Sequence, residues 1–164
     1  MTSPGSKIRD NQAPQRPPPH RAAGGGSPKT QKRRENPAGG LWSKAQVAAR
    51  SARMLAESGD LDGAVNRNYY AVFGAARASL ARVRASLAQS KGHDTIIRRF
   101  DKHLVKERGF DPSLGWPFFG RLRHARWAAD YDAARVDEAA ARAIIGEMDR
   151  FLAAAEPFLG KVKR

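Results

Sequence analysis

Apolar residues recur every three or four positions between residues 61 and 87, which is the spacing of one side of an α-helix. The residues of this stripe are Leu61, Val65, Tyr69, Val72, Phe73, Ala76, Leu80, Val83 and Leu87. The opposite side carries alanines and Gly74 together with Arg67, Tyr70 and Arg77, where an ordinary solvated helix would carry lysine and glutamate. Small residues allow another backbone to approach closely. We therefore expect this second side to contact another helix, another subunit or a ligand.

The same helical spacing continues along most of the chain after residue 42. It predicts helices at about 43–58, 61–88, 93–108 and 117–131, and a fifth one that Asp137 caps. Ser43 and Gln46 form the pattern of a capping box at the start of the first helix, and Gly59 is a suitable residue to end it. Pro157 is expected to end or kink the fifth helix. No segment alternates with the period of a strand, so we predict an all-α fold, an antiparallel bundle of four to five helices.

The first 40 residues have a different composition. They contain seven of the ten prolines and six of the fifteen glycines, and Ile8 is their only large apolar residue. Such a segment buries too little apolar surface to offset the entropy of ordering its backbone. We therefore divide the chain into a disordered, basic tail (residues 1–40) and a helical domain (residues 41–164).

Charge and cysteine content narrow the classes of function. The formal net charge is +14, which favours polyanionic partners such as nucleic acid, although solvated faces rich in arginine would give the same value. The chain has no cysteine, no apolar leader at its start and no apolar run long enough to span a membrane. We expect a soluble, cytoplasmic protein without disulfides or thiolate metal sites.

The fourth predicted helix carries the residues best suited to bind an anion. Arg123, Arg126 and Asp130 project from one side of it, and Trp127 and Tyr131 lie on the adjacent strip. In a cationic pocket, Arg126 would bind a phosphate, Asp130 would orient it or accept a proton, and an aromatic residue would stack a base. The alternative is a structural pair between Arg126 and Asp130, with both aromatic residues in the core.

His93, at the start of the third predicted helix, is the candidate for proton transfer, because an imidazole titrates near neutral pH. The alternative is a helix cap or a packed surface residue. The histidines and carboxylates form no metal-ligand pattern, and the chain has no glycine-rich phosphate loop. We therefore expect neither a metal nor another cofactor.

Three short motifs, in order, resemble those of the HEPN domain family (higher eukaryotes and prokaryotes nucleotide-binding). Residues 67–73 read Arg-Asn-Tyr-Tyr-Ala-Val-Phe and are similar to the Arg-x-Tyr-Tyr-Ala-x-Phe signature of the family's second helix. His93 and Phe100 match its His-x(6)-Phe segment, and residues 126–131 match its Arg-x-x-Ala-Asp-Tyr segment. The resemblance covers about residues 42–159.

This resemblance implies a helical bundle that pairs as a homodimer with a composite cleft, and that is often the toxin partner of a minimal nucleotidyltransferase. Active relatives are metal-independent ribonucleases in which an arginine is closely followed by a histidine. In this chain no histidine follows Arg126, and Asp130 stands near the expected place. Asn66 replaces the family's serine, and His93 is the residue that could supply an imidazole from a neighbouring helix or subunit.

These observations leave three functions open. The first is a HEPN-type RNA- or nucleotide-binding module, working with a nucleotidyltransferase-type antitoxin partner. The second is a metal-independent endoribonuclease toxin, and the third is a non-catalytic helical interaction protein. The candidate residues are Arg126, Asp130 and His93 for catalysis; Arg67, Tyr70, Arg123 and Tyr131 for binding RNA or nucleotide; and Gly74, Ala71 and Ala78 for a homodimer interface.

Overall fold

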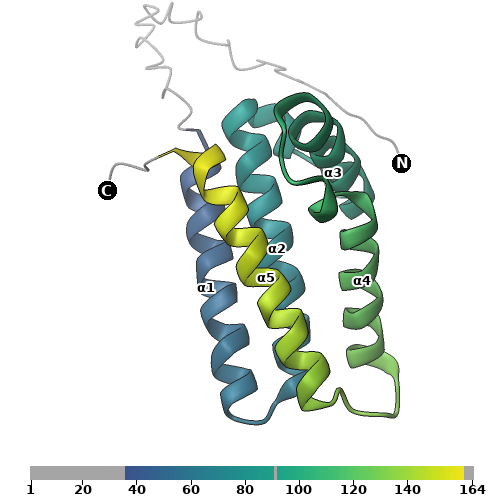
Figure 1. The fold of residues 1–164 in the computed structure, drawn as a ribbon. Coiled ribbons are helices and arrows are strands. Elements are labelled where there is room, and N and C mark those ends of the chain that lie inside the picture. The colour runs from purple at the N-terminus through teal and green to yellow at the C-terminus, as the bar shows by residue number, and fades with distance from the viewer. Residues whose placement is uncertain (1–35, 91, 161–164) are drawn as a thin grey trace, which may run out of the picture. The chain divides into compact units, whose positions relative to one another are not determined.

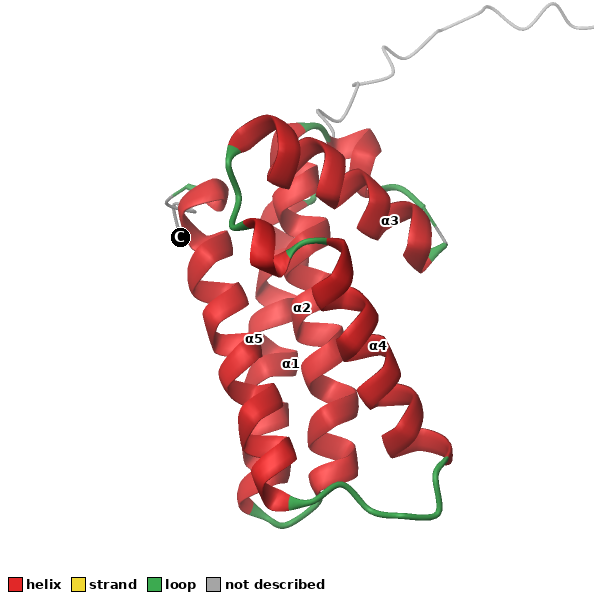
Figure 2. Ribbon diagram, turned by 45° about the vertical axis from the view of Figure 1, so that its right-hand side comes forward, coloured by secondary structure: helices red, strands yellow, loops and turns green. Residues whose placement is uncertain are grey.

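The computed structural model describes residues 36–90 and 92–160, which contain helices and no strand. Its α-helices are α1 (Ala38–Glu57), α2 (Leu61–Val83), α3 (His93–Phe100), α4 (Trp116–Tyr131) and α5 (Glu138–Leu159). Helices α1, α2 and α5 pack side by side, and α4 runs along the other side of α2 (Figure 1). Helix α3 lies near the N-terminal end of α4 (Figure 2). The predicted all-α bundle is confirmed for the described part of the chain.

Several helix ends follow the local sequence. Gly59 ends the turn after α1 with a φ of +85°, a conformation that glycine adopts without steric cost. Asp60 caps the start of α2, since its carboxylate accepts a hydrogen bond from Gly63 N at 3.0 Å. Asp137 caps α5 in the same way and accepts from Ala140 N at 2.8 Å, as predicted.

The predicted start of the first helix is wrong. Helix α1 begins at Ala38, so Ser43 and Gln46 lie inside it and form no cap. Ala38 N donates to Asn36 Oδ1 at 3.0 Å, and Ala38 itself is buried in the core. Because this burial extends the helix toward its N-terminus, the boundary predicted after residue 40 falls within α1. Residues 1–35 of the predicted disordered tail lie outside the described residues.

The middle and last helices also differ from the prediction in detail. Helix α2 ends at Val83 and is followed by a 3₁₀ turn, Ala85–Ala88, where one continuous helix was expected. Helix α3 continues as a π-helical segment, Asp101–Lys106, and hydrophobic spacing alone does not predict that change of winding. Helix α5 runs through Pro157 and ends two residues later, at Leu159, which packs in the core.

A cluster of buried aromatic rings joins α3, α4 and α5. Its members are Phe100, Phe110, Phe118, Phe119 and Phe151. The ring of Phe151 on α5 stacks on Phe118 with 5.6 Å between centroids and lies 5.5 Å from Phe100. Large aromatic side chains contribute much of the apolar area that stabilises a core. This cluster therefore fixes the positions of α3 and α4, which carry most of the candidate site.

The small-residue side of α2 packs within the chain. A Cβ atom built at Gly74 would lie 3.2 Å from Cβ of Ala45 on α1, and Ala71 and Ala78, one turn to either side, are fully buried. The homodimer interface predicted at these three residues is therefore wrong, because α1 already covers this side. The sequence allowed this side of α2 to contact another helix, another subunit or a ligand. In the structure, Gly74 contacts another helix, α1. A homodimer through another surface stays a prediction.

Candidate functional site

Arg126 of α4 lies against two consecutive tyrosines of α2. Its Cζ atom is 5.3 Å from the ring centroid of Tyr69 and 5.0 Å from that of Tyr70. A guanidinium group at this distance is attracted by the aromatic ring. Tyr69 is buried, whereas Tyr70 is 38% exposed and the Arg126 side chain is 28% exposed. The two rings therefore hold the guanidinium group at a position that solvent still reaches.

Asp130 links the same two helices. Its Oδ2 atom is 3.3 Å from Arg126 Nε, and its Oδ1 atom accepts a hydrogen bond from Asn66 Nδ2 at 2.7 Å. The pair with Arg126 has the distance of an ion pair but not the alignment of a hydrogen bond. Because both carboxylate oxygens already have partners, the geometry is that of a residue that positions Arg126. The predicted role of Asp130 in proton transfer stays untested.

His93, the first residue of α3, is oriented by α2. Its Nδ1 atom lies 2.7 Å from the hydroxyl oxygen of Tyr69, and its ring stacks on Phe73 with 4.2 Å between centroids. Burial lowers the pKa of His93, and the nearby charge of Arg126 lowers it further. The imidazole is therefore neutral at pH 7.

The Tyr69 hydroxyl determines which ring nitrogen of His93 carries the hydrogen. Burial raises the pKa of Tyr69, so the phenol keeps its proton. Among the described residues, its hydrogen has no acceptor other than His93 Nδ1, and an unpaired buried donor would cost about 1–3 kcal/mol. We therefore infer that Tyr69 donates to Nδ1, which leaves the hydrogen of the neutral ring on Nε2. His93 then presents an N–H donor.

Three arginines act on His93 from two helices. Arg77 of α2 and Arg123 and Arg126 of α4 all lower its pKa, whereas Asp94 raises it. Arg123 Nη1 pairs with Asp94 Oδ1 at 2.5 Å. Arg77 Nη2 donates to the carbonyl oxygen of Ala88 at 3.2 Å, and no described carboxylate pairs with it. We call the group formed by His93, Tyr69, Arg77, Arg123 and Arg126 the His93 site.

The structure brings together most of the predicted residues. Arg126, Asp130, His93, Tyr70 and Arg123 all belong to the His93 site or contact it. Their approach joins residues from α2, α3 and α4 that lie up to 60 positions apart in the sequence.

Arg67 and Tyr131, two further predicted binding residues, lie on the surface. Arg67 is exposed on α2, one turn before Tyr70. Tyr131 is 71% exposed and Trp127 is 55% exposed, with 5.7 Å between their ring centroids. The interpretation that placed these two aromatic residues in the core is therefore wrong.

Sequence reasoning did not assign site roles to Tyr69, Arg77, Asn66 or Phe73. Tyr69 was expected in the core, which is correct for its ring but leaves out its hydroxyl. Arg77 follows Tyr70 by seven residues and therefore lies on the same side of α2. That spacing was the available signal, and it becomes informative only once His93 is known to pack on Tyr69 and on Phe73, one helical turn before Arg77.

Metal ligands and membrane-spanning helices are both absent from the described segments. Within residues 36–90 and 92–160, no group of three histidine, aspartate or glutamate side chains lies close enough together to hold a metal ion. None of the helices within those segments is both long and apolar enough to cross a membrane.

Comparison with known proteins identifies a family. The HEPN domain family profile matches residues 38–157, from the first residue of α1 to the last turn of α5. The chain is also 31% identical, over 123 residues, to a UPF0332 protein of Gloeobacter violaceus, across 74% of this chain and 94% of that protein. The profile match includes every residue of the His93 site. The chain therefore belongs to the HEPN domain family.

Proposed function

We propose that this chain is a HEPN-type RNA- or nucleotide-binding module and that the His93 site binds a phosphate group. The observation that carries the proposal is the placement of two arginines beside His93: Arg126 lies over Tyr69, whose hydroxyl bonds His93, and Arg123 pairs with Asp94, the next residue along α3. Two carboxylates, Asp94 and Asp130, accompany the three guanidinium groups of the His93 site, so the site has an excess of positive charge.

Each residue has a distinct contribution to anion binding. Arg126 is held by Tyr69 and Tyr70, and among the described residues no group bonds to its two terminal nitrogens. These nitrogens are suited to charge-assisted hydrogen bonds with phosphate oxygens. The Nε2–H group of His93 adds a neutral donor. Tyr70 is partly exposed beside Arg126 and offers an aromatic surface for a base.

A toxin–antitoxin-like pair with a minimal nucleotidyltransferase is the biological setting that the family resemblance supports. We propose it on that ground alone. Co-purification of the chain with a nucleotidyltransferase encoded beside it, compared with an unrelated nucleotidyltransferase, tests the partnership. Equal recovery of both partners would contradict it.

A metal-independent endoribonuclease is the second candidate function. His93 and Arg126 both contact Tyr69. This arrangement favours a ribonuclease, because the group that transfers a proton and the group that binds the phosphate must lie close together. With Tyr69 as donor, however, Nε2 of His93 carries a hydrogen and cannot accept the proton of an attacking hydroxyl. A base at this position requires the hydrogen on Nδ1 instead. For this reason we rank binding above cleavage.

Fluorescence anisotropy with a labelled oligouridylate tests the binding function. A 2′-O-methyl oligomer prevents cleavage during the measurement. We expect Arg126→Ala to weaken binding about tenfold or more and to reduce the salt dependence by about one phosphate contact. Arg142→Ala is the matched control, because it removes the same charge from the exposed surface of α5. Equal affinities of the two variants would contradict the proposal, and no binding by wild type would favour the helical interaction protein.

Cleavage is tested separately with unmodified RNA and a chelator present. The binding function predicts intact RNA with both wild type and His93→Ala. Cleavage by wild type that is lost in His93→Ala would establish the ribonuclease instead.

A further inference from the structure

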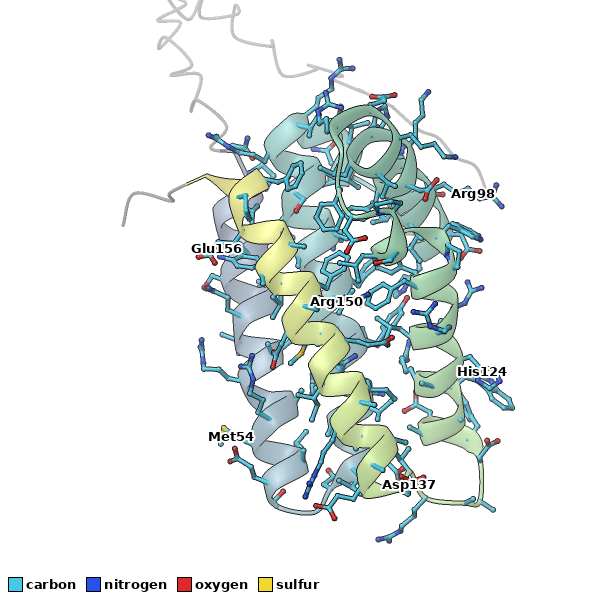
Figure 3. All side chains as sticks on the ribbon, in the orientation of Figure 1. Met54, Arg98, His124, Asp137, Arg150 and Glu156 are labelled. Carbon is cyan, nitrogen blue, oxygen red and sulfur yellow. The ribbon has the colours of Figure 1, made fainter. Side chains whose placement is uncertain are left out.

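A shallow groove lies between α3 and the first half of α4. One side is formed by residues of α3 and the π-helical segment after it, and the other by residues of α4. Both sets have the spacing i, i+3, i+4 and i+7: Asp94, Ile97, Arg98 and Asp101 face Trp116, Phe119, Gly120 and Arg123. Arg98, near the end of α3, lies at the outer edge of the bundle (Figure 3).

Trp116 forms a fixed aromatic surface at one end of the groove. The residue is 38% exposed, and Cζ of Arg98 lies 5.0 Å from the centroid of its ring. Its backbone N–H donates to Asp101 Oδ1 at 3.2 Å. A Cβ atom at Gly115 would approach the same oxygen to 2.8 Å, so the residue before Trp116 has no room for a side chain. The start of α4 is therefore tightly positioned, while the indole ring stays accessible.

Gly120 leaves the groove open. A Cβ atom built there would meet no atom within 4 Å, and the hollow beside it is lined by Ile97 and Phe119, both buried, together with Trp116 and Arg123. A glycine inside a helix normally weakens that helix. At this position the missing side chain keeps an apolar hollow accessible between a tryptophan and an arginine.

The groove leads directly to the His93 site. Arg123 lines the groove and also acts on the pKa of His93, and Arg126 follows it after one helical turn. Trp116 and Arg126 are ten residues apart, or about 15 Å along α4. Stacked nucleotides rise by roughly 3.4 Å each, so about four of them cover this distance. A single nucleotide cannot contact both Trp116 and Arg126.

We propose that the α3–α4 groove is a second nucleotide subsite, in which Trp116 stacks a base of a single-stranded RNA whose phosphate occupies the His93 site. Arg98 and Arg123 offer guanidinium groups at the edges of the groove for the intervening phosphates, although Asp94 already pairs with Arg123 and Asp101 accepts a hydrogen bond from the Trp116 backbone. An aromatic surface beside basic residues is the common arrangement for binding single strands without sequence preference. This inference rests on the proposed function and extends it to the class of ligand, a strand of several nucleotides.

Two variants block the groove in different ways. Trp116→Ala removes the stacking surface, and Gly120→Gln fills the hollow without changing the charge. The control is Gly146→Gln, because Gly146 is also exposed inside a helix, and a Cβ atom built there would likewise meet no atom within 4 Å. Each protein is titrated with a 2′-O-methyl decauridylate and, separately, with uridine monophosphate, after circular dichroism confirms equal helix content.

We expect Trp116→Ala and Gly120→Gln to lower the affinity for the decauridylate by about fivefold or more. Their affinity for the mononucleotide should equal that of wild type, and Gly146→Gln should change neither. Decauridylate affinities equal to that of wild type would overturn this inference, as would an equal loss for both ligands. If Arg126→Ala still weakens binding in that case, the proposed function stands without the second subsite.

Discussion

Replacing Tyr69 by phenylalanine tests the assignment of His93 as a hydrogen-bond donor. The substitution removes one hydroxyl group and keeps the ring on which Arg126 lies. The lost hydrogen bond, 2.7 Å long, contributes about 1 kcal/mol to the free energy of unfolding, because the half-buried His93 can bond to water instead. For a domain of this size, the melting temperature should fall by about 3–5 °C.

The tautomer of His93 is the sharper measurement. Nuclear magnetic resonance of the ring nitrogens should show the hydrogen on Nε2 in wild type and a mixture of tautomers in Tyr69→Phe. The pKa of His93 should rise in the variant, since a bond that favours the neutral ring is gone. It should stay below its ordinary value, because burial and Arg126 still act on it.

Tyr131→Phe is the matched control, since Tyr131 is exposed and its hydroxyl has no partner among the described residues. It should leave the melting temperature and His93 unchanged. A wild-type His93 with its hydrogen on Nδ1 would refute the reasoning and favour the ribonuclease. An unchanged tautomer and melting temperature in Tyr69→Phe would refute it as well.

Two further predictions concern stability. Because the folded state lowers the pKa of His93, the unfolded state binds more protons below about pH 6.5. The free energy of unfolding, measured with urea, should therefore fall more steeply below that pH in wild type than in His93→Gln, and parallel curves would contradict this. Gly74→Leu should destabilise the fold by about 1–3 kcal/mol through its contact with Ala45, whereas Gly146→Leu, which faces open space, should not. Equal urea midpoints for these two variants would show that α1 does not pack closely at Gly74.

Local spacing in the sequence was sufficient for much of the fold and for part of the site. The apolar stripe of α2, the cap at Asp137 and the pair between Arg126 and Asp130 depend on residues within a few helical turns. The predicted cap at Ser43 failed because burial of Ala38 outweighed a local signal.

Contacts between distant segments could not be predicted in this way. The small residues of α2 allowed three kinds of neighbour, and only packing against Ala45 shows which one is present. The bond from Tyr69 to His93 spans 24 residues and depends on where α3 crosses α2. For the same reason Arg77 was recognised as part of the site only in the structure.

The most direct test of the central claim is a titration of the wild-type protein with uridine monophosphate, followed through its histidine ring resonances. The account predicts that the His93 signals shift with the nucleotide concentration. The signals of His103, which pairs with Glu107, and of His124, which projects outward from α4 (Figure 3), should stay in place. Unchanged His93 signals at saturating nucleotide, or equal shifts at His93, His103 and His124, would contradict a phosphate site at His93.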